Sequence, residues 1–235
     1  MISYKKEGVN MLYLLLLGCG TINTARPLPE GAQALSATFG GPMVAFGEGY
    51  VPLPNLVVEH RIGMPQWSNH ALDVNYGLNL TTIAFDQIGL HVGASTLLLD
   101  QNGGVPAVSV ATKTFVYNNY LSKGPAESEG IWAAQTFDLT TSWQVKSALF
   151  YLGGRQALDY KSPSFLLTPF VGVEIGKNGI VTNQKTGSSF QLEFQHYGTG
   201  RINEASLVEW RTIQDTGAFG FSFGYSNRFD KNSKN

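Results

Sequence analysis

The chain has little cysteine, little charge and no long apolar run. Its 235 residues include one cysteine, Cys19, which excludes an intramolecular disulfide and a cysteine-based structural zinc site. Only 14% of the residues are charged and the net charge is -1, which excludes the basic surface of a nucleic-acid binder. No stretch has the roughly 18 apolar residues of a membrane-spanning helix.

Aromatic residues and glycine are abundant instead. The chain contains 12% aromatic residues and 27 glycines, and its length fits one domain with a sizeable core. Low charge combined with many aromatic residues and glycines is typical of a β protein, especially one that presents apolar side chains to lipid.

The N-terminus has the pattern of an export signal, since Lys5 and Lys6 precede an apolar segment over 11–17. The run Leu16-Leu17-Gly18-Cys19 resembles the bacterial lipobox, in which a small residue precedes the cysteine that receives diacylglycerol. The alternative is a short hydrophobic helix that ends in cysteine.

The resemblance to the lipobox implies a lipoprotein signal peptide over 1–18 and lipidation at Cys19. Gly20 follows the cysteine in place of aspartate, which in the known Gram-negative sorting rule favours the outer membrane. Residues 20–31, "GTINTARPLPEG", are polar and broken by proline, so we interpret 19–31 as a lipidated tether.

The segment 71–81, "ALDVNYGLNLT", alternates apolar and polar residues with period two, which predicts a strand with one apolar face. Alternation recurs over 55–64, 88–98, 131–143, 165–176 and 218–225, and more weakly over 33–39, 105–116, 147–156 and 188–197. We therefore predict about ten strands, with eight as the alternative, in a domain over 32–229 followed by a polar tail over 230–235.

The polar face of these strands carries glycine, small polar residues and charges of both signs. A small barrel has a cramped interior in which small residues and paired charges fit, so we predict that the polar face is inward and the apolar face outward. The candidates for a polar network in the lumen are Glu59, Arg61, Asp73, His91, Lys113, Asp138, Arg155, Glu174 and Glu193.

The whole pattern resembles small bacterial outer-membrane β-barrels, and the aromatic face of 218–225 is similar to their C-terminal insertion signal. The resemblance implies an all-β, antiparallel, up-and-down transmembrane barrel in the outer membrane of a Gram-negative bacterium. Its expected partners are outer-membrane lipids and the barrel-insertion and lipoprotein-sorting machineries. We expect a monomer with no cofactor, no metal and no nucleic acid.

Catalytic chemistry has weak support in the sequence. His91 and Ser95 resemble the pairs of outer-membrane lipid deacylases, but residues four apart on a strand lie about 13 Å apart, too far for a nucleophile and its base. Asp73, Asp138 and His91 resemble the Asp/His sites of ten-stranded outer-membrane proteases. We expect His91 to hydrogen-bond Asp73 or Glu59 instead.

Three functions remain open at this point. The leading hypothesis is a non-enzymatic barrel with a structural or surface-interaction role or a narrow pore for small solutes. The second is a lipid-modifying enzyme or protease with its site at the barrel rim. The third is a lipid-anchored soluble β-barrel that binds an apolar ligand.

Overall fold

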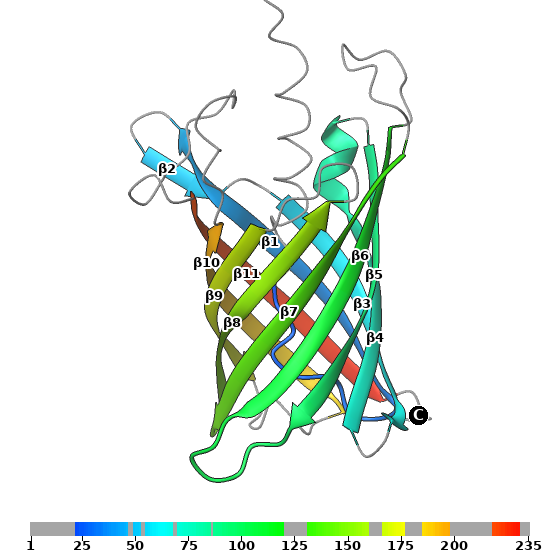
Figure 1. The fold of residues 1–235 in the computed structure, drawn as a ribbon, viewed down its shortest axis with the longest axis vertical. Coiled ribbons are helices and arrows are strands. Elements are labelled where there is room, and N and C mark those ends of the chain that lie inside the picture. The colour runs from blue at the N-terminus through cyan, green and yellow to red at the C-terminus, as the bar shows by residue number, and fades with distance from the viewer. Residues whose placement is uncertain are drawn as a thin grey trace, which may run out of the picture.

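The chain folds into a closed antiparallel barrel of ten strands (Figure 1). The computed structural model describes residues 22–46, 49–52, 55–67, 70–85, 87–119, 131–159, 166–176, 185–197 and 218–230. Each barrel strand pairs with its neighbours in the chain, and the last strand pairs back to the first, with Ala32 opposite Asp230. Closure leaves no sheet edge unpaired, as a membrane-spanning sheet requires.

The ten barrel strands lie where the alternation predicts them. They are β1 (Ala32–Phe46), β3 (Asn55–Trp67), β4 (His70–Asn79), β5 (Gln87–Leu99), β6 (Ala107–Asn119), β7 (Ile131–Val145), β8 (Ala148–Asp159), β9 (Leu166–Gly176), β10 (Gly187–Tyr197) and β11 (Ala218–Asp230). The prediction of about ten strands is confirmed, and the eight-stranded alternative is wrong.

Two details differ from the prediction. Residues 40–54, which lie between the predicted strands 33–39 and 55–64, include the end of β1 and a short strand, β2 (Gly49–Pro52), which pairs with it beyond the barrel wall. The link between β4 and β5 contains the 3-10 helix η1 (Leu80–Phe85). The longer β1 therefore projects as a hairpin from one rim (Figure 1).

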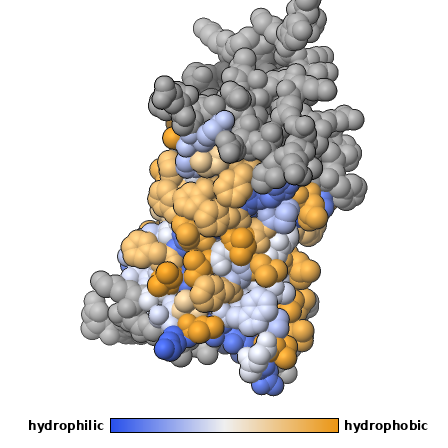
Figure 2. All heavy atoms as spheres, turned by 90° about the vertical axis from the view of Figure 1, so that its left-hand side faces the viewer, coloured by the Kyte–Doolittle hydropathy of each residue, from blue (hydrophilic) through white to orange (hydrophobic). Residues whose placement is uncertain are grey.

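On the face that Figure 2 shows, apolar side chains cover much of the outer surface of the barrel. The large apolar side chains that are exposed come from the outward positions of almost every strand; examples are Leu78, Val92, Leu139, Leu152 and Val171, which are 45–58% exposed. The opposite positions carry the buried polar residues. The prediction that the apolar face is outward is therefore confirmed, and the apolar interior that the third hypothesis needs is not present in the described lumen.

The barrel has two rims, which the ends of its first and last strands distinguish. β1 begins and β11 ends at the same rim, where the turns β3–β4, β5–β6 and β7–β8 are short. We call it the terminal rim, and the rim that carries β2 and η1 the distal rim. In the part of the chain that the structure describes, no helix is long and apolar enough to cross a membrane.

Candidate functional site in the barrel lumen

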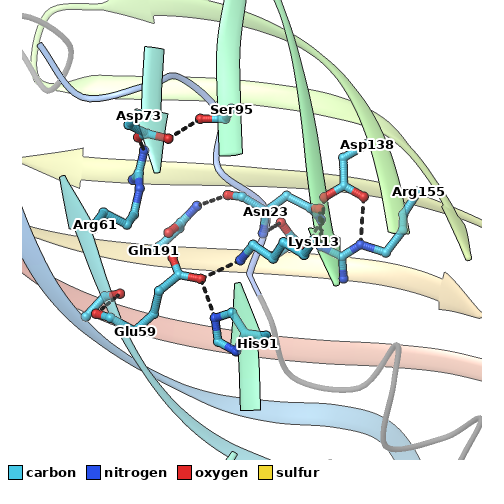
Figure 3. A network of polar contacts seen from close by, with 12 residues as sticks. Asn23, Glu59, Arg61, Asp73, His91, Ser95, Lys113, Asp138, Arg155 and Gln191 are labelled. Carbon is cyan, nitrogen blue, oxygen red and sulfur yellow. Dashed lines mark hydrogen bonds and ion pairs between the residues drawn. The ribbon is translucent and has the colours of Figure 1, made fainter. Parts of the chain in front are cut away.

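The nine residues predicted for the lumen all come from inward positions, and the structure buries eight of them fully. Figure 3 shows seven of these side chains pointing into the lumen: Glu59, Arg61, Asp73, His91, Lys113, Asp138 and Arg155. Arg61, whose side chain is 11% exposed, is the partial exception. Buried charges need compensation by partners, and the lumen supplies it in separate clusters.

Glu59 is the centre of the first cluster. It accepts hydrogen bonds from His91 Nε2 at 2.9 Å and Lys113 Nζ at 2.6 Å. The strand between Glu59 and His91 places Gly77 at the paired position. A Cβ on Gly77 would lie 2.5 Å from His91 Cε1. Because glycine has no Cβ, the His91 side chain can lie over Gly77 and reach Glu59 on the strand beyond it.

The same device recurs on the other side of the barrel. Gly172 pairs with Glu193 on one neighbouring strand and with Tyr151 on the other, and a Cβ there would lie 2.3 Å from Tyr151 Oη. Tyr151 crosses this gap and donates to Glu193 Oε2 at 3.0 Å. In both places, an inward glycine on the middle strand leaves space for a hydrogen bond between side chains on the two flanking strands.

Three acid–base pairs complete the wall. Arg155 forms a bidentate pair with Asp138, at 2.8 and 3.0 Å, the strong geometry for such pairs. Arg61 and Ser95 both donate to Asp73. At the terminal rim, Arg228 Nη2 and Ser189 Oγ donate to Glu174 Oε1 at 2.8 and 2.7 Å.

Residues 22–31 lie inside the barrel, as the blue segment in Figure 1 shows. They are the described part of the lipidated tether predicted over 19–31. Ile22 is 6% exposed, Asn23 1% and Leu28 1%. The segment contacts the middle of β11 near Gly224 and descends to the terminal rim, where it turns into β1. We call residues 22–31 the luminal segment.

Polar side chains of the wall bind the main chain of the luminal segment at several points. Gln191 Nε2 donates to Asn23 O at 2.8 Å, Ser109 Oγ to Ala25 O at 2.9 Å and Arg61 Nη2 to Arg26 O at 3.0 Å, while Glu193 Oε2 accepts from Asn23 N at 3.0 Å and Asp73 Oδ2 from Leu28 N at 2.9 Å. Buried main-chain groups are costly without partners, and the lumen satisfies these.

Two side chains of the segment are also bound. Asn23 Nδ2 donates to Glu193 Oε1 at 2.9 Å, and Arg155 Nη2 donates to Asn23 Oδ1 at 2.5 Å. Arg26 donates to Ser142 and to Gln101 near the terminal rim. Burial lowers the pKa of the Arg26 guanidinium and the nearby Asp100 carboxylate raises it, and an arginine stays protonated throughout the physiological range.

The barrel wall has room for the segment at one specific place. A Cβ on Gly63 would lie 2.0 Å from the carbonyl oxygen of Pro29, so only glycine at this inward position of β3 lets the segment pass. Around Ile22 to Ala25 the remaining cavity is about 30 Å³, enough for about two waters. The described lumen is therefore closed at this level.

The catalytic combinations suggested by the sequence are not brought together. His91 binds Glu59, Ser95 binds Asp73, and Asp138 binds Arg155. The expectation that His91 hydrogen-bonds Asp73 or Glu59 is met by Glu59. Among the described residues no group of three or more histidine, cysteine, aspartate or glutamate side chains could hold a metal ion. Cys19 and the proposed signal peptide lie outside the described residues.

Several residues of the network were missed by the sequence reasoning. Arg228 and Tyr151 both fall on the inward period of their strands. Tyr151 lies within the predicted strand 147–156, and Arg228 lies three residues beyond 218–225, so following the alternation through both segments would have found them. Asn23 and Arg26 carry no periodic signal, because the luminal segment is neither helix nor strand.

Comparisons with known proteins give little beyond the architecture. No family model matches the chain, and no curated protein matches it. Among solved structures it is similar to the translocator domain of autotransporter NalP from Neisseria meningitidis, with 11% identity, 94% of each chain covered and a TM-score of 0.48. The assignment of the fold rests on the strand pairing of this chain itself.

Proposed function

We propose that this protein is an outer-membrane barrel whose lumen is closed by its own luminal segment, with a structural or surface-interaction role and not that of an open pore. The apolar outer surface supports the membrane location, because in water it would be exposed at a cost of about 25 cal/mol per Å². The single observation that carries the closed state is the burial and hydrogen bonding of residues 22–31 inside the barrel.

Conductance in planar lipid bilayers tests this function. The wild-type protein should give no stable conductance steps. Gly63→Val should give them, since its side chain would occupy the place of the Pro29 carbonyl and displace the segment. Gly104→Ala is the matched control, because a Cβ at Gly104 meets nothing within 4 Å. Steady conductance of the wild-type protein would contradict the proposal.

Lipidation at Cys19 is the second part of the proposal, and it is supported by the lipobox pattern Leu16-Leu17-Gly18-Cys19. Labelled palmitate fed to the expressing bacterium should be incorporated into the wild-type protein and not into Cys19→Ser. Equal labelling of both proteins, or of neither, would contradict this part alone and leave the closed barrel unaffected.

The two parts constrain each other. Ile22 lies three residues after Cys19, and three residues span at most about 11 Å. Ile22 contacts Gly224, which is six residues, or about 20 Å of strand, from the end of β11 at the terminal rim. The leaflet beside the terminal rim is therefore out of reach for an acylated Cys19 while Ile22 keeps its place in the lumen. Both parts of the proposal hold together only if the acyl chains lie elsewhere.

A second function, catalysis at the rim, has no observation in its favour among the described residues. We keep the expectation of a non-enzymatic protein as a proposal. Assays for lipid deacylation and for peptide cleavage with the purified protein would test it, and any activity lost in His91→Ala would contradict it.

A further inference from the structure

The contacts between the wall and the luminal segment are those of a binding site for a peptide that is neither helix nor strand. Five of them reach main-chain atoms, at Asn23, Ala25, Arg26 and Leu28. They come from β3, β4, β6 and β10, on opposite sides of the barrel. Contacts to the main chain give affinity that depends little on sequence, and side-chain contacts add selectivity.

Selectivity in this site concentrates at Asn23. Its amide lies between the Glu193 carboxylate, which accepts from Nδ2, and the Arg155 guanidinium, which donates to Oδ1 (Figure 3). The asparagine amide offers donors on Nδ2 and an acceptor on Oδ1, so it matches both partners. Aspartate would bring a second negative charge to Glu193, and leucine would leave both charged groups without these bonds.

Small apolar contacts separate the polar ones. Ala25 packs against Leu149, Tyr151 and Phe170, and Leu28 packs against Ala32 and Ala34 beside the terminal rim. The site therefore selects a sequence of the form Asn-x-Ala-x-x-Leu that bends at the alanine and the residue after it.

The luminal segment is also separate from the sheet. No described residue of 22–31 before the start of β1 pairs in the barrel ladder, so the ten strands close without it. Its junction with β1 is an exposed turn at Glu30. The segment is thus joined to the barrel through this turn, in which Glu30 is exposed and Gly31 N donates to Gly63 O at 3.2 Å.

We propose that the barrel lumen is a binding site for a short peptide, with residues 22–30 as its resident ligand, and that a peptide of this sequence binds in trans once the resident segment is cut from the barrel. This site does not depend on the membrane location or on lipidation. In the intact chain the resident segment excludes other peptides, because its covalent attachment gives it a high effective concentration.

Cleavage after Glu30 by a glutamate-specific protease tests the proposal on the full-length protein in detergent. The digestion is carried out with an excess of a fluorescent peptide, Ile-Asn-Thr-Ala-Arg-Pro-Leu-Pro-Glu, which matches residues 22–30. Heat-modifiable gel migration reports whether the barrel stays folded. Glu30→Gln, which alters an exposed side chain and removes this cleavage site, is the matched control.

The protein cut after Glu30 should bind one peptide per barrel. The Glu30→Gln protein, which the protease can cut only at the glutamates that both proteins share, should bind none. A peptide with alanine in place of Asn23 should bind about 100-fold more weakly, because it loses two hydrogen bonds to charged groups. Absence of binding to the folded, cut barrel would overturn the proposal. Equal binding of the two peptides would do so as well.

A second variant keeps the test decisive if the cut barrel unfolds. Full-length Asn23→Ala retains the segment but weakens its hold at the selective position. At peptide concentrations in the millimolar range, this protein should bind the wild-type peptide while the wild-type protein does not. Failure of Asn23→Ala to bind while it remains folded would then overturn the proposal.

Discussion

Replacement of Arg155 by methionine should lower the free energy of unfolding by about 3–5 kcal/mol, the cost of removing one partner of a buried ion pair. The Arg155 side chain is 1% exposed and that of Asp138 3%. Without the guanidinium, the Asp138 carboxylate would stay buried without its bidentate partner, and Asn23 Oδ1 would lose its donor. Urea unfolding in lipid vesicles, followed by tryptophan fluorescence, measures the change.

A double substitution separates the loss of the pair from the loss of packing. Arg155→Met combined with Asp138→Leu removes both charges and should recover most of the stability, since a buried pair replaced by apolar residues is often neutral or better. If Arg155→Met alone costs less than about 1 kcal/mol, the lumen around Asp138 is hydrated enough to screen the charge. That outcome would contradict the closed lumen described above.

Replacement of Leu139 by arginine should destabilise the protein in a bilayer by about 2–4 kcal/mol, the cost of a basic side chain on the lipid-facing surface near the membrane midplane. Leu139 lies in the middle of β7 and is 54% exposed. In a water-soluble barrel the same change would place a charge in solvent, where surface substitutions are usually within about 0.5 kcal/mol of neutral. The measurement is again reversible unfolding in lipid vesicles.

Val145→Arg is the matched control, because Val145 lies on the same face of the same strand and is also 54% exposed. It differs in its depth, since β7 ends there at the terminal rim. Arginine near the membrane interface costs only about 0–1 kcal/mol. Equal effects at the two positions, or solubility of either variant without detergent, would contradict the membrane location.

The choice of partners in the lumen could not be predicted from the sequence. Both Asp73 and Glu59 were equally good acceptors for His91, and only the register settles the choice, by placing Gly77 between Glu59 and His91. Register depends on all strands closing together, and the alternation within one strand does not determine which of its residues pair with which residues of the next strand. For the same reason, the hydrogen bond from Tyr151 to Glu193, for which Gly172 leaves space, could not be predicted from the sequence.

The luminal segment was misread for a different physical reason. Asn23, Arg26 and the prolines around them have the composition of a solvated linker, because they form neither a helix nor a strand. In the structure, wall side chains replace water as the partners of this main chain. Composition reports that a segment needs polar partners, and it does not report whether water or protein provides them.

The sequence by itself determined the strands and their two faces, because a side-chain period of two follows from local backbone geometry and appears in any ten-residue window. Small and charged residues on one face and large apolar residues on the other also determined which face is inward. Only the tertiary structure decided which charges pair and what fills the lumen. Both depend on residues such as Asn23 and Glu193, which lie 170 positions apart and meet only when the barrel closes around the segment.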